Sequence, residues 1–277
     1  LVPFHQWSPD AYQGAPTPVT AFLSVGPKAA GFAVLIRLFV GSFGSSMLSA
    51  SWLGTLGLIC LLTMVVGNVA ALTQSNVKRM MAYSSIAQAG YMLLGLVSLG
   101  GKTLTGLDSV GAVLFFILTY VFTNLGAFAV IIAVEQATGS AEIEAYRGLM
   151  RRAPLLAVSL VVFFLSLVGV PPLAGFLAKF AVFGAAVTGG QVPLAVVGVL
   201  TGVVSVVYYF GIVREMFFGA PEEGQPGAIR LGTGSAFVVL VALLMTLVVG
   251  LWPEPFINLS NTVAHSIAPV IKAAAGH

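Results

Sequence analysis

The sequence predicts an all-α integral membrane protein with about seven transmembrane spans. Of the 277 residues, 58% are hydrophobic and only 8% are charged, and the mean hydropathy is +1.02. In soluble domains about a quarter of all residues are charged. Apolar runs of about 20 residues recur along the chain, and each is long enough to cross a bilayer as a helix. No hydrophilic stretch is long enough for a separate soluble domain, so we expect residues 1–277 to form a single membrane domain.

The spans follow the apolar runs in order. Residues 1–18 are expected to be the end of a broken helix and a loop. The predicted spans are 19–38, 52–74, 80–100, 109–134, 154–187, 193–218 and 231–252. The fifth is expected to be broken at Pro171 and Pro172, because proline lacks a backbone N–H and clashes with the preceding helical turn.

Two further segments have the apolar spacing of helices that lie on a membrane surface. In residues 141–152 the apolar positions are Ile143, Tyr146, Leu149 and Met150. In residues 256–276 they are Phe256, Leu259, Val263 and Ile267. We therefore predict a surface amphipathic helix in each segment.

The positive charges fall mainly at one end of the predicted bundle. That end has Lys78, Arg79, Arg147, Arg151, Arg152, Arg214 and Arg230, and the opposite end has Arg37, Lys102 and Lys272. Loops rich in Lys and Arg stay on the inner side of a membrane, so the carboxyl end is predicted to lie outside. We interpret Lys78 and Arg79 as topology charges and Glu135 as an interfacial residue. The net charge of +3 is explained by these loops, and no nucleic-acid partner is expected.

Several classes of site are excluded by the residues present. Cys60 is the single cysteine, which excludes a disulfide framework and an iron–sulfur cluster. The three histidines are too scattered for a metal or haem site, and no nucleotide-binding glycine motif occurs. We expect no metal and no cofactor in this chain. It begins Leu1-Val2-Pro3-Phe4, without methionine or a signal-peptide pattern, which predicts a fragment.

Two lysines, Lys28 and Lys179, lie well inside predicted spans. A lysine at the centre of a membrane helix costs roughly 2.5 to 3.5 kcal/mol and usually faces a bundle interior or a hydrated cavity. The alternative is that each side chain extends along its helix to the membrane surface. A buried lysine amine has a lowered pKa and can exchange protons near neutral pH. The hypothesis is that Lys28 and Lys179 are relay points in a proton path.

Each lysine is close to a break in its helix. Pro27 precedes Lys28, and Pro171 and Pro172 lie eight and seven residues before Lys179. Proline cannot donate to the carbonyl four residues earlier, so the last two prolines should leave the carbonyls of Leu167 and Val168 free. Broken helices at membrane depth occur where they are buried in protein or line a wet cavity.

Other polar residues within spans are weaker candidates. Tyr91, Tyr120, Thr123 and Asn124 could hold water between the lysines, or could simply form hydrogen bonds between helices. His5 could shuttle protons or make a structural hydrogen bond.

Three stretches of the sequence resemble a known family. They are VPFHQWSPDAYQGAPTPVTAFLSVGPKAAGF, SNVKRMMAYSSIAQAGYML and GVPPLAGFLAKF. They resemble the antiporter-like, proton-translocating membrane subunits of respiratory complex I (NADH–quinone oxidoreductase) and of related cation/proton antiporters. The form YQGAPTPVTAFLS with GPK, and lysine at Lys179, is most similar to the subunit N type, whose mitochondrial counterpart is subunit 2.

The resemblance implies a fold and a set of partners. The fold would be an antiporter-like helix bundle with inverted repeats and discontinuous helices, of which this chain is the carboxyl-terminal part. Lys28 matches a central lysine of the family and Lys179 the lysine of a broken helix. NADH, FMN, iron–sulfur clusters and quinone would be in the assembled complex, and neighbouring antiporter-like and small subunits would contact this chain in a bacterial plasma (inner) membrane.

Two other functions stay open at this point. The same motifs occur in multisubunit Na⁺/H⁺ antiporters and membrane-bound hydrogenases. A purely structural membrane scaffold is the second alternative, and it predicts that Lys28 and Lys179 can be replaced without loss of proton transport.

Overall fold

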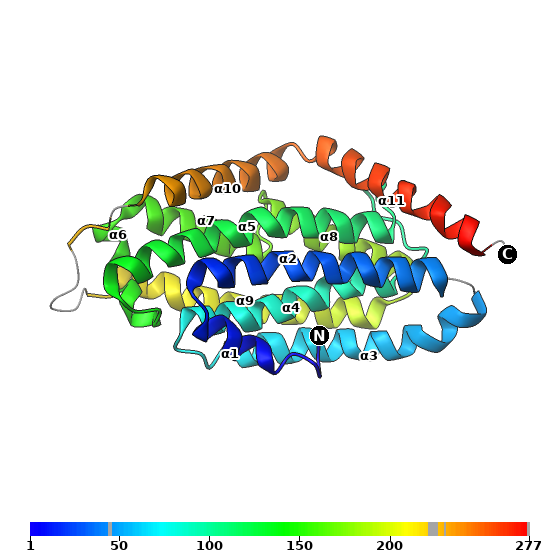
Figure 1. The fold of residues 1–277 in the computed structure, drawn as a ribbon, viewed down its shortest axis with the longest axis horizontal. Coiled ribbons are helices and arrows are strands. Elements are labelled where there is room, and N and C mark those ends of the chain that lie inside the picture. Colours follow the sequence, from blue (N-terminus) through cyan, green and yellow to red (C-terminus); the bar gives the residue numbers. More distant parts are fainter. Residues whose placement is uncertain (44–45, 221–226, 230, 276–277) are drawn as a thin grey trace.

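The computed structural model describes residues 1–43, 46–220, 227–229 and 231–275, and nearly all of these residues are helical. Most of the helices run along the long axis of the molecule (Figure 1). They are α1 (Trp7–Gly14), α2 (Thr17–Leu35), the π-helix η1 (Ile36–Ser42), α3 (Ser46–Ala71), α4 (Val77–Val97), α5 (Ser109–Thr138), the 3₁₀-helix η2 (Ile143–Tyr146), α6 (Leu149–Arg152), α7 (Pro154–Val168), α8 (Ala174–Thr188), α9 (Val192–Phe218), α10 (Thr233–Leu251) and α11 (Glu254–Ala275).

Six helices in the described part of the chain are long and apolar enough to cross a membrane. They are α2 with the start of η1, most of α3, and the whole of α4, α5, α9 and α10. The two shorter apolar helices α7 and α8 stand where the sequence predicts one broken span, and residues 169–173 separate them. The prediction of an all-α membrane protein is confirmed.

Helix α4 is the centre of the bundle, and nearly all of its residues are buried. It contacts α1, α2, α3, α5, α8 and α9. The approach of α3 to α4 depends on Gly67, because a Cβ there would lie 2.6 Å from the backbone nitrogen of Ala87.

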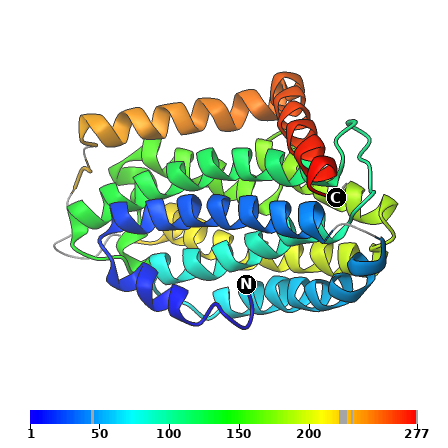
Figure 2. The same ribbon diagram turned by 45° about the vertical axis from the view of Figure 1, so that its right-hand side comes forward.

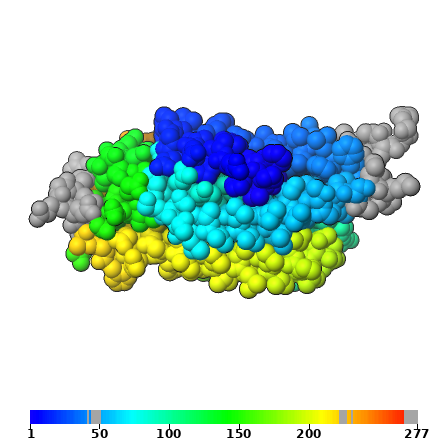
Figure 3. All heavy atoms as spheres, turned by 90° about the horizontal axis from the view of Figure 1, so that it is seen from below, coloured from blue at the N-terminus to red at the C-terminus, as the bar shows by residue number. Residues whose placement is uncertain are grey.

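An apolar surface covers the outside of the bundle. Seen from below, α1, α3 and α9 form the visible face (Figure 3). The exposed side chains of α9 on it are aliphatic or aromatic, and include Leu200, Val203, Val207 and Phe210. Such a face is suited to contact with lipid or with apolar neighbouring helices.

Helices α10 and α11 lie along one long side of the molecule, and α11 turns away from the direction of α10 (Figure 2). Helix α11 contacts α5 and η1. Its Ser260 and Ala264 are buried, whereas Leu259 and Val263 are exposed. The predicted surface helix 256–276 falls on α11, apart from residue 276, which lies outside the described residues.

The prediction of a surface helix at residues 141–152 is wrong. The segment instead forms η2 and the single turn α6, and Gly148 between them has a left-handed backbone with φ of 63°. Tyr146 and Leu149 are fully buried, since the segment folds back against α7 and α9. Its apolar stripe therefore faces the protein core and not a membrane surface.

The positively charged loops meet at one end of the bundle, which we call the arginine-rich end. The starts of α4 and α7 and the ends of α5 and α9 lie there, joined by contacts such as the hydrogen bond from the Gly148 nitrogen to the Glu215 carbonyl oxygen at 3.0 Å. Lys78, Arg79, Arg147, Arg151, Arg152 and Arg214 belong to this end, at the left of Figure 1. Arg230 lies outside the described residues.

Candidate functional site

The Lys28 amine lies among neutral oxygen atoms of α4 and α5. It donates to the Ser85 carbonyl oxygen at 2.8 Å, to the Ser85 Oγ at 2.7 Å and to the Tyr120 hydroxyl at 3.1 Å. The nitrogen also lies 4.1 Å from the centroid of the Tyr120 ring, a favourable position for a cation. The side chain is half-buried, and its stem lines a pocket of about 250 Å³ between α1, α2 and α4. The Lys28 amine is directed toward α4 and α5 inside the bundle. The side chain therefore does not extend along α2 to the membrane surface, which was the alternative.

The Lys179 amine is held at the break between α7 and α8. Lys179 is 6% exposed, and its Nζ donates to the Val168 carbonyl oxygen at 2.8 Å. The Leu167 carbonyl oxygen accepts from Gln88 Nε2 at 3.0 Å. Both carbonyls that the prolines were expected to leave free thus accept hydrogen bonds from side chains. The Lys179 nitrogen lies 4.7 Å from the centroid of the Tyr91 ring.

A small cavity of about 10 Å³ lies beside Lys179. Lys179 and Tyr120 both line it, and the Tyr120 hydroxyl is the group that accepts from Lys28. Thr123, Ser166 and Gln88 supply further polar groups to its walls. This volume is about the least that holds one water molecule, and a buried water needs two to four polar partners. One water there would join the two lysines through Tyr120.

The other predicted polar residues fix the helices around this cavity. The Tyr91 hydroxyl accepts from Asn68 Nδ2 at 3.0 Å and lies 3.3 Å from Thr201 Oγ1. Thr123 Oγ1 lies 3.2 Å from Ser166 Oγ, and Asn124 Nδ2 donates to Ser24 Oγ. These contacts join α5 to α2 and α7, and α4 to α3 and α9. The hydrogen bonds between helices that the sequence allowed as an alternative are therefore present.

His5 is not joined to either lysine by a hydrogen bond. It lies before α1, and its Nδ1 is buried without a hydrogen-bond partner among the described residues. Helix α2 continues without interruption through Pro27, so the helix break expected beside Lys28 is not present.

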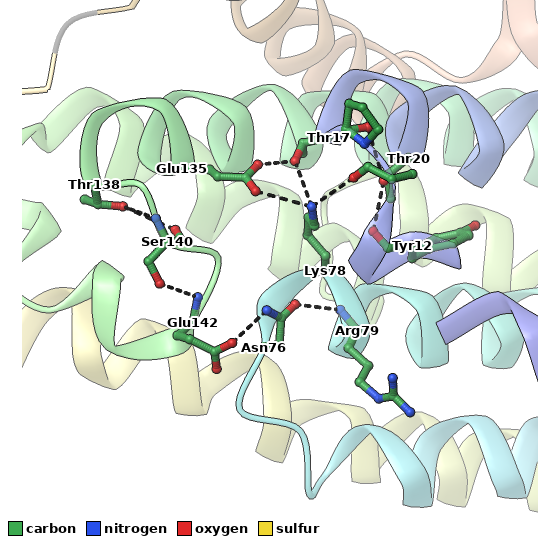
Figure 4. Close-up of polar contacts among 12 residues, drawn as sticks. Tyr12, Thr17, Thr20, Asn76, Lys78, Arg79, Glu135, Thr138, Ser140 and Glu142 are labelled. Atoms are coloured by element: carbon green, nitrogen blue, oxygen red, sulfur yellow. Dashed lines mark hydrogen bonds and ion pairs between the residues drawn. The ribbon is translucent and has the colours of Figure 1, made fainter. Parts of the chain in front are cut away.

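The structure adds a contact to the interpretation of Lys78 as a topology charge and of Glu135 as an interfacial residue, because the two form an ion pair. Lys78 begins the buried helix α4, and its amine lies 3.3 Å from Glu135 Oε1 near the end of α5 (Figure 4). The amine also donates to the Ala15 carbonyl oxygen at 3.0 Å and to Thr17 Oγ1 at 3.3 Å. The Thr17 hydroxyl donates in turn to Glu135 Oε2. The Lys78 side chain is 6% exposed and that of Glu135 is 29% exposed.

Sequence reasoning missed Ser85 and Gln88 as well as this ion pair. The signal was present in α4, where Ser84, Ser85, Gln88 and Tyr91 put polar groups at helical spacing on a span with a central position in the bundle. Ser84 and Ser85 face opposite sides, because Ser84 contacts the Tyr209 hydroxyl of α9 and Ser85 contacts Lys28 of α2. Nothing local to Lys78 points to Glu135, which is 57 residues away in the chain.

The described residues offer no cluster for a metal ion. No three His, Cys, Asp or Glu side chains come together in that part of the chain. The polar groups around the two lysine amines are hydroxyls, amides and carbonyls, which form hydrogen bonds.

Known proteins resemble this chain over most of its length. The subunit N of NADH-quinone oxidoreductase from Desulfitobacterium hafniense is 43% identical over 277 residues, covering 96% of this chain and 55% of the relative. A chain of respiratory complex I from Thermus thermophilus, solved with bound aureothin, is 39% identical with a TM-score of 0.76, covering 93% of this chain and 55% of that one. A chain of an archaeal membrane-bound sulfane sulfur reductase is 33% identical with a TM-score of 0.85, covering 99% and 54%.

These comparisons support the antiporter-like fold that the sequence motifs implied. The chain spans about half the length of the curated relatives it matches. Residues 1–205, which include Lys28, Lys78, Glu135 and Lys179, match the family model described as NADH:quinone oxidoreductase/Mrp antiporter, transmembrane. The chain belongs to this NADH:quinone oxidoreductase/Mrp antiporter family of membrane proteins.

Proposed function

We propose that this chain belongs to a proton-translocating membrane subunit of an NADH–quinone oxidoreductase, and that Lys28 and Lys179 exchange protons within it. The observation that carries the proposal is the pair of lysine amines, each held by neutral oxygens, and the Tyr120 hydroxyl between them, which accepts from Lys28 and lines one water-sized cavity together with Lys179. An amine without a carboxylate partner can be present in its neutral form without leaving a buried negative charge. It can therefore accept and release a proton in place.

The order of the groups supports a path from Lys28 to Lys179. Tyr120 accepts from Lys28 and borders the cavity that Lys179 also lines. Charged Lys28 gives a proton to the Tyr120 oxygen as Tyr120 gives its own hydroxyl proton to a water in the cavity, and that water gives a proton to the neutral Lys179 amine. Lys28 is then neutral and Lys179 charged, and rotation of the Tyr120 hydroxyl and the water restores the hydrogen bonds for the next proton. NADH oxidation and quinone reduction would take place in partner subunits and supply the free energy.

The setting of the subunit follows from the same evidence. The proposed partners are the other membrane subunits of the complex, and the lipid bilayer of the bacterial plasma membrane surrounds the apolar face of α3 and α9. The arginine-rich end is proposed to face the inside, because Lys- and Arg-rich loops stay on that side. The carboxyl end would then lie on the outer side.

The test replaces each lysine in the intact assembly, in the full-length subunit. Lys28→Ala and Lys179→Ala should each abolish most proton translocation by membrane vesicles, whereas Lys102→Ala, at an exposed position, should leave it unchanged. Unchanged translocation in Lys28→Ala or in Lys179→Ala, with the normal amount of assembled complex, would exclude the relay and favour a structural scaffold.

A second candidate is a subunit of a multisubunit Na⁺/H⁺ antiporter or of a membrane-bound hydrogenase. It is favoured by the high TM-score of 0.85 with the sulfane sulfur reductase chain, an assembly that is not named as an NADH oxidoreductase. NADH oxidation by the purified native assembly separates the two. An assembly that translocates protons and oxidises no NADH would support the second candidate.

A further inference from the structure

One face of α2 carries a stripe of buried hydroxyl groups that runs from the arginine-rich end toward Lys28. Thr17, Thr20 and Ser24 precede Lys28 at intervals of three and four residues, so the four side chains lie on one side of the helix. The hydroxyl residues are at most 4% exposed. The Lys78–Glu135 ion pair closes the outer end of this stripe, because Thr17 contacts both members of the pair.

Tyr12 and Ser85 run beside the stripe and reach the same lysine. The Thr20 hydroxyl donates to the Tyr12 carbonyl oxygen at 3.0 Å, and the Tyr12 hydroxyl lies 3.1 Å from Ser85 Oγ. Ser85 Oγ in turn accepts from Lys28. Figure 4 shows the Lys78 amine beside both Glu135 and Thr17, with Thr20 and Tyr12 on the side of Lys78 away from Glu135. Polar groups thus extend from Glu135 to Lys28 through otherwise apolar helices.

The surroundings of Glu135 differ from those of a structural ion pair. Its carboxylate is partly exposed, whereas its partner Lys78 is almost fully buried. Tyr146 of η2 has a buried hydroxyl without a hydrogen-bond partner among the described residues. Burial raises the pKa of this hydroxyl and the charge of Glu135 raises it further, so Tyr146 stays a proton donor beside the carboxylate.

Few other charges face this carboxylate. Helices α7 and α10 have no ionisable residues, and on α2 and α8 the single ionisable residues are Lys28 and Lys179, at the centre of the bundle. Helix α11 meets α5 near Gly111, at the opposite end. The described elements α4 and η2 bring Lys78, Arg79, Tyr83, Glu144 and Tyr146 to this end of α5. Of these, Lys78 contacts the carboxylate, whereas Arg79 pairs with Asp10 and Glu144 with Arg147.

We propose that Glu135 is the residue that takes up protons at the arginine-rich end, and that Lys78 holds its carboxylate against the stripe leading to Lys28. This rests on the proposed function. Glu135 gains a proton from water and becomes a neutral acid, which frees it from Lys78. It then passes the proton to the neutral Lys28 amine through waters between the hydroxyls of the stripe, because the Thr20 and Ser24 hydroxyls donate to backbone carbonyl oxygens and not to one another. The carboxylate forms again and pairs with Lys78.

The test compares neutral variants of the buried pair in the intact assembly. Glu135→Gln should reduce proton translocation by vesicles at least tenfold, and Glu135→Asp should retain part of it with an altered pH profile. The double variant Lys78→Met/Glu135→Gln leaves no unpaired buried charge, so it should assemble normally and still fail to translocate. Thr20→Val, which removes one hydroxyl of the stripe, should slow translocation.

The exposed pair between Arg79 and Asp10 provides the matched control. Arg79 directly follows Lys78 in the chain. The side chain of Arg79 is 32% exposed and that of Asp10 is 74% exposed. Arg79→Gln/Asp10→Asn should translocate protons normally. If the double variant of Lys78 and Glu135 also translocates normally, the pair is structural and the proposal is wrong. Loss of translocation in Lys28→Ala, together with a normal Glu135→Gln, would reject proton uptake at Glu135 and leave the proposed function intact.

Discussion

The break between α7 and α8 allows a prediction about one glycine beside Lys179. Gly169 ends α7 with φ of 95° and ψ of 49°, a left-handed conformation that side chains with a Cβ disfavour by about 1–2 kcal/mol. A Cβ added there would also lie 2.9 Å from Cδ of Lys179. Gly169→Ala therefore strains the backbone and pushes directly on the stem of the lysine.

The displacement of the lysine can be estimated from these contacts. Ordinary van der Waals contact begins at 3.4 Å, so Cδ of Lys179 must move by about 0.5 Å. The bond from Nζ to the Val168 carbonyl oxygen would lengthen from 2.8 Å toward about 3.3 Å, at the limit of hydrogen bonding. A weakened bond of this kind costs about 1 kcal/mol, in addition to the backbone strain.

Gly139 is the matched control. It ends α5 in the same left-handed region, with φ of 71°, and a Cβ there would meet nothing within 4 Å. Gly139→Ala should make the complex in native membranes about as sensitive to heat as Gly169→Ala does, measured as the amount of assembled complex that remains after heating. Gly139→Ala should nevertheless keep full proton translocation, whereas Gly169→Ala should lose both heat stability and proton translocation. Equal translocation in the two variants would refute the argument that contact with Gly169 positions Lys179.

Other substitutions test the packing and the lysine contacts. Tyr120→Phe keeps the ring beneath Lys28 but removes the hydroxyl through which the proposed path runs, so proton translocation should fall nearly as far as in Lys28→Ala; near-normal translocation would mean that the proton does not pass through this hydroxyl. Ser85→Ala removes the oxygen shared by Lys28 and Tyr12, and translocation should slow while the amount of assembled complex stays normal. Gly67→Ala would put a Cβ against the Ala87 backbone and should destabilise the subunit by about 1–3 kcal/mol, seen as earlier loss of complex on heating. Gly211→Ala, with nothing within 4 Å of its Cβ, should not destabilise it.

The break in the fifth span shows what the sequence could predict. The loss of backbone donors at Pro171 and Pro172 follows from proline chemistry alone, and so does the freeing of the two carbonyls. The structure adds which side chains use them: Lys179 bonds Val168, from eleven residues along the chain, and Gln88 bonds Leu167 from another helix. The proline positions predict which carbonyl oxygens lack a helical donor, but the packing of the helices determines which side chains donate to them.

The segment at residues 141–152 shows how a correct pattern can give a wrong location. Its apolar stripe is real, and Tyr146 and Leu149 are fully buried. An apolar stripe predicts burial against something apolar, and a membrane surface and a protein core meet that requirement equally. The positive φ of Gly148 turns the chain toward α7 and α9, and that turn decides between them.

The lysines show why charge at membrane depth must be interpreted together with its partner. Lys28, Lys78 and Lys179 are all buried or half-buried. The sequence distinguished Lys28 and Lys179 from Lys78 because only those two lie inside predicted spans. The physical difference lies in their partners. Loss of a proton from Lys28 or Lys179 removes a buried charge, whereas loss from Lys78 would leave Glu135 without its counter-charge. We assign the proton exchange in this pair to Glu135, because its side chain is the more exposed of the two, and Lys78 holds the carboxylate in place. Isolated lysines inside predicted spans identify Lys28 and Lys179 from the sequence. The pairing of Lys78 with Glu135 becomes visible only in the fold, which brings the start of α4 to the end of α5.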